Sequence, residues 1–586
     1  MQFQLRLKAV KEPLLDLMIT AVRYRSFFPF LGRSLNKIDA WTIGSVVVAM
    51  TIAIPISFVI WLAFSPTENV WPHLFSTVLP RLVGTTLVLM LGVAIGTCFI
   101  GVGTAWLVTM CQFPGRRFFE WALLLPLAVP SYVIAFVYTD LLEFAGPLQG
   151  SLRGIYGWTT PQDYWFPEVR SLGGATSMMS LVLYPYVYLL SRAAFLEQTA
   201  GVLEVSRTLG YGPWRSFFTI SVPLARPAVV VGLILVMMET LNDFGTVDLF
   251  GVQTLTLGIF DVWLNMNNVG GAAQIAVVML MLIALLIAIE RFARRKKKFH
   301  QTSQRYKRLA SRDLTMGSAF LASIACTLPI LLGFIVPFSV LIRDATGYFN
   351  DALDGVFLMS VWNSLSLAGL ASILAVSIGV LLAYGMRLNG WGIFAAITRF
   401  ASLGYAIPGA VLAIGIFIPM GLLDNSIDEF MRNKFGISTG LLLSGSIAAL
   451  TFAYVVRFLA LSLGAVEVSL GRITNNIDGV AKTLGASHGA ILWRVHLPMI
   501  RASLLTGAIL VFVDVMKELP MTVIMRPFNF ETLATQVYQF SAAEQFEQAA
   551  PAALAIVASG IIPVILLSIA ITKVNFGRRD PLGVNV

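Results

Sequence analysis

Four carboxylates occur as two pairs inside otherwise apolar stretches of the sequence. Glu239 and Asp243 lie four residues apart, and Asp514 and Glu518 repeat this spacing 275 residues later. Residues four apart share one face of a helix. Because an ionised group at the centre of a membrane costs about 2.5–3.5 kcal/mol, acids inside a span usually line a polar path or pair internally. Such a group could bind a cation, either a metal ion or a basic organic molecule.

A polar residue accompanies each pair at the equivalent position, Asn242 in the first and Lys517 in the second. The candidate substrate path comprises Glu239, Asn242, Asp243, Asp514, Lys517 and Glu518. Hard trivalent iron prefers oxygen ligands, so ferric ion fits this path. A structural interpretation is equally open, in which Glu518 or Asp514 pairs with Lys517 and the other acids are hydrogen bonders at the outer boundary. The four histidines are scattered over loops on both sides, so no histidine metal site is assigned.

The composition places these residues in a membrane protein. Hydrophobic residues make up 57% of the 586 positions and charged residues 12%, against about 45–50% and about 25% in soluble domains. Apolar runs of about 20 residues predict twelve helices. They lie near 40–64, 85–110, 118–142, 174–196, 224–245, 272–290, 317–343, 363–386, 397–423, 440–463, 501–523 and 552–573. Prolines interrupt the third, fourth, ninth and eleventh, at Pro126, Pro130, Pro185, Pro408 and Pro520.

The distribution of basic residues predicts the orientation. With the N-terminus on the cytoplasmic side, 33 of the 41 Lys and Arg residues fall in inside segments and seven in outside loops. This asymmetry fits the positive-inside rule for twelve spans with both termini cytoplasmic. The net charge of +10 is therefore a signal of topology, and we expect no nucleic-acid partner.

The two halves of the chain repeat each other in sequence. Matches at offsets of 275–278 residues run over nearly 170 positions, which indicates a duplication. They pair Thr86-Leu87 with Ser364-Leu365, Gly101 with Gly379, Ala105 with Ala383, Pro130 with Pro408, Gly210 with Gly485, Pro223 with Pro498, and Thr254-Leu255 with Thr532-Leu533. Because each half has six spans, the halves form a parallel repeat about an axis normal to the membrane, with the path at their interface.

This organisation divides the chain into five parts. A cytoplasmic N-terminal segment, 1–39, precedes the first repeat, 40–290, whose core is 81–290. A basic cytoplasmic linker, 291–316, leads to the second repeat, 317–575, whose core is 359–573, and a cytoplasmic tail covers 576–586. The expected fold is an all-α polytopic membrane protein of twelve transmembrane helices.

The loop after the fourth span of each half has the same pattern. Residues 203–227 and 478–502 each predict a short amphipathic helix that reaches a glycine, a second short helix, and a proline at the start of the next span. Gly210 and Gly485 could take the positive φ that a helix C-terminus often needs, and Pro223 and Pro498 fit a first helical turn. Two copies at equivalent positions point to a functional surface rather than to ordinary loops.

These loops resemble the signature of the inner-membrane permeases of binding-protein-dependent ABC importers. That signature runs Glu-Ala-Ala, a short spacer, Gly, a longer spacer, an apolar residue and Leu-Pro. The matching positions are Glu204, Ser206, Gly210, Ile220 and Pro223 in the first copy, and Gly479, Ala481, Gly485, Val495 and Pro498 in the second. The second copy has Gly479 where the family has Glu, with Asp478 one place earlier. The two contacts with an ATPase could therefore be unequal.

The resemblance implies a type I ABC importer permease fold in the bacterial inner membrane, surrounded by lipid. Its partners would be a periplasmic binding protein and two cytosolic ATPase subunits, each holding a coupling helix in a groove. Residues 241–263 and 514–538 look like the ferric-iron permeases, which are similar fused chains, and the resemblance covers roughly 40–575. We therefore expect import of ferric iron, with thiamine, which also has fused permeases, as the alternative.

The sequence offers no catalytic residue. It contains no Gly-Lys dipeptide, so the phosphate loop G-x-x-x-x-G-K-[ST] is missing. We expect ATP to be used by a partner subunit, and no cofactor bound by this chain. An ion-coupled secondary transporter can also have two six-span halves but does not need the duplicated loops. A membrane enzyme would need a nucleophile–base or metal constellation.

Overall fold

A computed structural model describes residues 40–64, 71–197, 210–295, 312–352, 355–389 and 392–576. Glu204 and Ser206 of the first loop lie outside these ranges. Within them the chain is almost entirely helical, and the two strands, β1 (Cys111–Gln112) and β2 (Arg312–Asp313), form one short parallel pair. The expected all-α fold is confirmed.

The helices of the two halves follow each other in the same order. The first half contains α2 (Ala40–Phe64), α3 (Trp71–His73), η1 (Leu74–Val78), α4 (Leu79–Met110), α5 (Arg116–Ala122), η2 (Leu125–Ala128), α6 (Ser131–Leu142), α7 (Pro147–Tyr156), η3 (Pro161–Asp163), α8 (Leu172–Glu197), α10 (Pro213–Ser216), η4 (Phe217–Ser221), α11 (Val222–Asn242), α12 (Gly245–Leu249), α13 (Leu255–Phe260), η5 (Asp261–Asn265) and α14 (Val269–Arg295). The second half contains α15 (Met316–Ile330), η6 (Leu331–Ile335), α16 (Val336–Ala352), α17 (Gly355–Asn389), α18 (Gly392–Ala401), η7 (Ser402–Ala406), α19 (Gly409–Phe435), α20 (Ile447–Leu470), α21 (Asn475–Thr483), α22 (His488–Ile491), η8 (Leu492–His496), α23 (Leu497–Met516), α24 (Pro520–Met525), α25 (Leu533–Ala542) and α26 (Phe546–Phe576).

Ten helices in the described ranges are long and apolar enough to cross a membrane, or eleven spans if a bent helix pair counts as one. Ten of the twelve expected spans fall on these helices. The third expected span is the bent pair. The twelfth falls on α26, of which Phe546–Ile561 is scored as a shorter apolar helix.

The expectation of a straight third span over 118–142 is wrong. The segments Arg116–Ala128 and Ser131–Tyr156 meet at 88°. At the corner, Val129 and Pro130 are extended, with ψ of 120° and 147°. A proline lacks the N–H for a helical bond and pushes the residue before it out of the helical region.

The expected ninth span over 397–423 is interrupted at the equivalent proline. Ile407 and Pro408 are extended, with ψ of 131° and 143°, and separate η7 from α19. The eleventh span ends at Met516 rather than at residue 523, and α24 begins at Pro520. Pro185, by contrast, lies inside α8 without ending it.

Four π-helical turns precede spans whose second residue is proline. They are η1, η4, η6 and η8, and the following prolines are Pro80, Pro223, Pro337 and Pro498. Proline cannot donate the regular i→i−4 bond, and its ring clashes with that carbonyl. A π turn moves the hydrogen bonding by one residue and lets the helix continue.

The duplication is visible as the same hydrogen bond in each half. The backbone N–H of Leu255 donates to Thr86 Oγ1 at 3.0 Å, and the N–H of Leu533 donates to Ser364 Oγ at 2.8 Å. In both halves the long helix that carries this hydroxyl, α4 or α17, packs on the next long span, α8 or α20. The repeated sequence matches therefore mark repeated contacts.

The first span of each half packs on the other half. Helix α2 contacts α17, α18 and α19 of the second half as well as α14 of its own, and α15, η6 and α16 contact α4, α5, α6 and α8 of the first half, while α16 also packs on α26 of its own half. Close approaches secure both contacts. A Cβ at Gly415 would lie 2.3 Å from Pro55 O, and one at Gly333 would lie 2.7 Å from Leu181 O.

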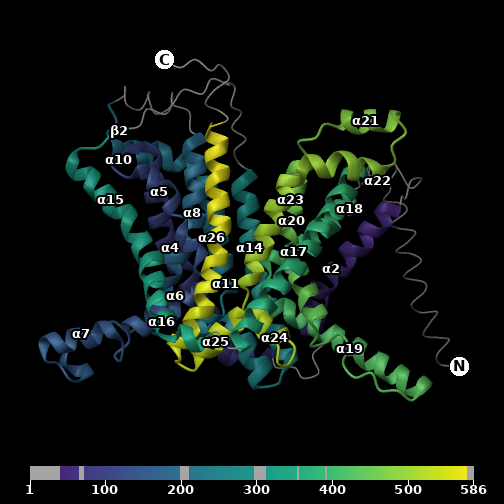
Figure 1. Cartoon of the computed structure of the whole chain (residues 1–586), viewed down its shortest axis with the longest axis horizontal. Coiled ribbons are helices and arrows are strands. Elements are labelled where there is room, and N and C mark those ends of the chain that lie inside the picture. Colours follow the sequence, from purple (N-terminus) through teal and green to yellow (C-terminus); the bar gives the residue numbers. More distant parts are fainter. Residues whose placement is uncertain are drawn as a thin grey trace.

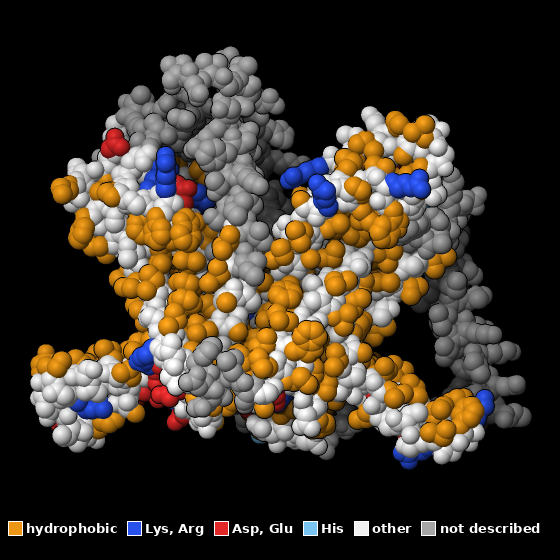
Figure 2. Space-filling view, in the orientation of Figure 1, with side chains coloured by type: hydrophobic (Ala, Val, Ile, Leu, Met, Phe, Trp, Pro, Cys, Tyr) orange, Lys and Arg blue, Asp and Glu red, His pale blue; other side chains and the backbone are white. Residues whose placement is uncertain are grey.

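The two ends of the molecule differ in shape. Helices α10, α21 and α22 lie at one end, and α7, α24, α25 and the far part of α19 lie at the other, where α7 and α19 project sideways (Figure 1). Hydrophobic side chains dominate the band between these ends, and Lys and Arg gather near them (Figure 2). This pattern is that of a protein embedded in a membrane.

Candidate functional site

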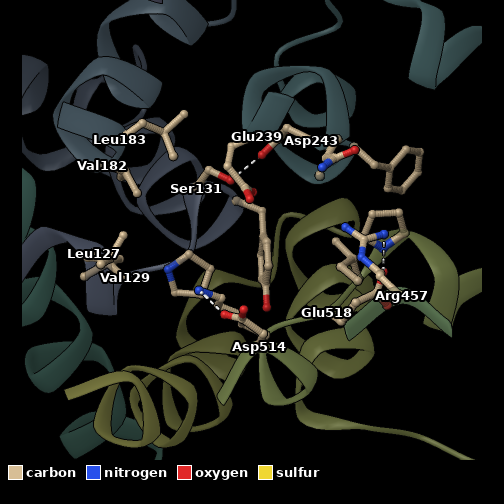
Figure 3. A pocket seen from close by; sticks show the side chains of 18 of the residues that line it. Leu127, Val129, Ser131, Val182, Leu183, Glu239, Asp243, Arg457, Asp514 and Glu518 are labelled. Carbon is tan, nitrogen blue, oxygen red and sulfur yellow. Dashed lines mark hydrogen bonds and ion pairs between the residues drawn. The ribbon is translucent and has the colours of Figure 1, made fainter. Parts of the chain in front are cut away.

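All six residues of the candidate path line one cavity of about 120 Å³. The first half contributes the start of α6, the middle of α8 and the end of α11, and the second half contributes η7, α20 and the end of α23. Glu239 and Asp243 lie on one side of the cavity, and Asp514 and Glu518 lie on the other (Figure 3). The repeat thus brings the four acids together, and their role in transport remains a prediction.

In the second half both acids have basic partners. Asp514 Oδ1 lies 2.9 Å from Lys517 Nζ, and Glu518 Oε1 lies 3.3 Å from Arg457 Nη1. Glu518 also caps α24, because it accepts hydrogen bonds from the N–H groups of Met521 and Thr522 at 3.1 Å each. This half therefore agrees with the structural alternative given from the sequence, in which Glu518 or Asp514 pairs with Lys517.

Among the described residues, the two acids of the first half form no ion pair with a basic side chain. Asp243 caps α12: it accepts a bond from Ser131 Oγ and further bonds from Thr246 N and Oγ1 at 2.9 and 3.0 Å. Glu239 accepts one long bond, 3.4 Å, from the Tyr405 hydroxyl. The side-chain oxygen of Asn242 is buried without a hydrogen bond. Among the described residues Glu239 forms no ion pair, and the charges of Lys517 and Arg457 act on it only over a longer distance.

Arg457 is a site residue that sequence reasoning missed, because it was counted with the inside segment after the tenth span. The expected span over 440–463 contains position 457 near its inside end, whereas α20 (Ile447–Leu470) places Arg457 near the middle of the helix, where it is only 8% exposed. Its approach depends on Gly409, where a Cβ would lie 2.2 Å from Arg457 Nη1. The position equivalent to Gly409 in the first half is Ser131, whose hydroxyl donates a hydrogen bond to Asp243.

The cavity carries an excess of negative charge. Its lining contains four carboxylates and two basic side chains, Lys517 and Arg457, so full ionisation gives it a formal charge of −2. Aromatic and apolar side chains, among them Tyr186, Phe244 and Phe458, form much of the rest. A small, mostly apolar chamber with a few converging oxygens can hold a cation, because low polarity strengthens each charge interaction.

The two loops that were expected to contact an ATPase have the same glycine and proline conformations in their described parts. Gly210 and Gly485 have φ of 75° and 79°, as their positions in the sequence predicted. Pro223 and Pro498 lie in the first turns of α11 and α23. The expected second short helix is not separate, because the helices run on through π turns that contain Ile220 and Val495. Gly479 and Ala481 lie in α21.

Asp478 is bound within the chain, on α21. Its Oδ2 lies 2.9 Å from Arg387 Nε, and its Oδ1 lies 2.8 Å from His496 Nε2. Arg387 also donates to the carbonyls of Leu470 at 2.6 Å and Ile473 at 3.0 Å. Burial by itself raises the pKa of Asp478. The hydrogen bonds from Arg387 and His496 lower it by more, so the pKa of Asp478 lies below its ordinary value. We call Arg387, Asp478 and His496 the α21 clamp.

Comparison with known proteins gives the same picture of the chain. Residues 97–298 match the family model of the binding-protein-dependent transport system inner membrane component. The Fe(3+)-transport system permease protein FbpB 2 of Haemophilus influenzae is 26% identical over 510 residues, which cover 84% of this chain and 90% of that protein. The molybdenum transport system permease protein ModB of Escherichia coli is 28% identical over 32% of this chain and 82% of its own length. The sulfate transport system permease protein CysW of the same organism is 26% identical over 42% and 83%.

Proposed function

We propose that this chain, which is a fused permease of a binding-protein-dependent transport system, imports ferric iron across the inner membrane. The central cavity carries the proposal, because its lining has a formal excess of two negative charges and includes Glu239 without an ion-pair partner. Hard cations prefer carboxylate and other oxygen ligands. A cleft of one charge sign raises the local concentration of ions of the opposite sign.

The charge of the cavity also bears on the choice between iron and sulfate, the substrates in the names of two relatives. Sulfate is an anion and would meet carboxylates without compensating positive charge in this chamber. The basic groups that could bind an anion, Lys517 and Arg457, are already paired with Asp514 and Glu518. The lining therefore favours iron over sulfate as the substrate of this chain.

In this proposal the chain is a conduit driven by partner subunits. A periplasmic binding protein delivers iron at the end of the bundle that carries α7 and α25, with both termini of the chain in the cytoplasm. Two ATPase subunits engage residues 203–223 and 478–498 at the opposite end and switch the cavity between outward and inward access. ATP binds and reacts in those subunits, and this chain contributes the path.

The proposal is tested by uptake in cells that lack this chain and then regain it. Regained uptake of labelled ferric ion, without regained uptake of labelled thiamine or sulfate, is the expected result. Regained thiamine uptake without iron uptake would assign the chain to the organic cation. Co-purification of an ATPase with the tagged chain is expected as well, since a secondary transporter would bring down none.

A further inference from the structure

A second cavity of about 170 Å³ lies beside the central one. Its polar lining consists of Tyr132, Arg170, Asp248, Tyr538, Ser541 and Glu544. These residues belong to α6, α12, α25 and the loops that precede α8 and α26, at the end of the bundle opposite to α10 and α21 (Figure 1). In the proposed orientation this is the side from which substrate arrives. We call it the outer cavity.

The outer cavity contains a polar group that lacks a partner. The Ser541 hydroxyl is buried, in a residue only 6% exposed, and makes no hydrogen bond. Leaving a buried polar group unsatisfied costs about 1–3 kcal/mol. In the same lining, the Tyr538 hydroxyl donates to Asp248 Oδ2 at 2.8 Å. A phenol, a carboxylate and an unpartnered hydroxyl therefore line one chamber.

The charges at the rim do not oppose a cation. Arg170 is held between Glu143 and Glu544, with its Nη2 2.7 Å from Glu544 Oε1. Its positive charge is thus offset by two carboxylates, whereas Asp248 forms no ion pair with a basic side chain of the described residues. Glu544 also has a φ of 58°, an uncommon conformation for a residue other than glycine that often marks a functional position.

The two cavities are adjacent and share part of their lining. Tyr132 and Gly245 line both of them. A Cβ at Gly245 would lie 2.7 Å from Tyr132 Cβ and 2.8 Å from Leu519 Cδ2. Gly245 is therefore packed between Tyr132 of its own half and Leu519 of the other half, at the place where the two halves meet.

We propose that the outer cavity is a second binding site for the imported ferric ion, filled before the central cavity. Its ligands are the Tyr538 phenolate and the Asp248 carboxylate, and the Ser541 hydroxyl supplies a third oxygen. Ferric iron is hard and selects such oxygens, and tyrosinate ligates iron in proteins. On binding, Tyr538 releases its phenolic proton to water, which frees Asp248 from their hydrogen bond. The iron stays ferric and no electron moves. This inference rests on the proposed function.

The test uses the purified full-length chain in lipid nanodiscs, titrated with ferric nitrilotriacetate. A phenolate bound to ferric iron absorbs visible light by charge transfer, so the wild type should develop a coloured band. Tyr538→Phe should lose the band, and Asp248→Asn should bind at least tenfold more weakly. Tyr156→Phe is the matched control, because Tyr156 is 63% exposed on α7 and should leave the band intact.

Two further results separate this inference from the proposed function. Glu239→Gln should keep the band while it loses iron uptake in cells, since it alters only the central cavity. Cells that import ferric iron through a chain whose band is absent, or is equal in wild type and Tyr538→Phe, would overturn the outer site and leave the proposed function standing. Failure of the wild type to import iron would overturn the proposed function itself.

Discussion

The two halves of this protein hold equivalent acids by different means. Asp514 and Glu518 of the second half are balanced by Lys517 and Arg457. At the matching positions of the first half, Asn242 and Val182 carry no charge. The scaffold is duplicated down to single hydrogen bonds, but the charge of the cavity is not. The comparison teaches that the second half provides a wall whose charges are paired and that the first half provides two carboxylates that form no ion pair among the described residues.

The loops at the opposite end show a second difference between the halves. The α21 clamp fixes the second loop to the end of α17. Counting back by the repeat offsets, its three positions correspond to Thr109, Leu203 and Ser221, which cannot form a charged cluster. The carboxylate beside Gly479 is thus engaged within the chain, so it does not replace the family glutamate as a free contact for an ATPase. The second loop should act as the stiffer of the two.

The largest expected effect comes from breaking the buried pair of the second half. Arg457→Met leaves Glu518 buried without its partner, which should lower the free energy of unfolding by about 3–5 kcal/mol. The double variant Arg457→Met/Glu518→Gln should recover most of this loss. Thermal unfolding of the purified chain measures both. Ser131→Ala is the control from the first half and should cost about 1 kcal/mol, because it removes one hydrogen bond. Equal losses in Arg457→Met and Ser131→Ala would end the distinction between the halves.

The next effect concerns transport. Glu239→Gln removes the unbalanced charge and should reduce ferric uptake ten- to a hundredfold, about 1.4–2.8 kcal/mol in the cation's interaction. The matched variant from the second half is Asp514→Asn/Lys517→Asn, which removes a neutral pair and leaves the cavity charge unchanged. It should retain uptake within about threefold, or roughly 0.7 kcal/mol. If the double variant loses more uptake than Glu239→Gln, the second half holds the substrate.

Features that follow from local sequence could be predicted. The duplication, the acids at matched positions, the positive φ of Gly210 and Gly485, and the prolines in first turns depend on residue type and spacing alone. Whether a proline breaks a span could not be predicted this way. Pro130 and Pro408 turn the chain, whereas Pro185 continues within α8, because neighbouring helices decide which backbone groups are satisfied.

The place of Arg457 could not be predicted for a related reason. The apolar run near 440 reads as part of a span, but Asp424 binds the N–H groups of Leu442, Leu443 and Ser444 at 2.7–3.1 Å and holds them in a loop. This long-range cap shifts the helix start by seven residues, from 440 to Ile447. The same shift moves Arg457 from near the inside end of the expected span to the middle of α20, in the cavity wall.

The glycines test what the halves share. Gly210→Val and Gly485→Val should each strain the backbone by about 1–2 kcal/mol, because a β-branched residue disfavours positive φ. The space around both is open, so the strain is the only cost. Membrane insertion should be normal. In the reconstituted importer, the rate of ATP hydrolysis should no longer be coupled to the rate of transport. Gly489→Val, in the helical α22 with equally open space, should stay coupled. Unimpaired substrate-stimulated hydrolysis in both positive-φ variants would contradict the assignment of these loops.

The smallest expected effect tests the difference between the loops. Asp478→Asn weakens the charged bonds of the α21 clamp, whose Arg387 and Asp478 side chains are 11% and 17% exposed. The loss should be about 1 kcal/mol, seen as roughly fivefold faster amide exchange over residues 475–485. Leu203→Ala at the matching position should leave exchange around Gly210 unchanged.

Because the folded-state pKa of Asp478 is lowered, its contribution to stability is present above the ordinary pKa near 3.9 and is lost only as the pH falls through the lowered pKa. Slow exchange of α21 should therefore persist from pH 8 to pH 5. Exchange in Asp478→Asn equal to that of the wild type would show that Asp478 does not hold the second loop.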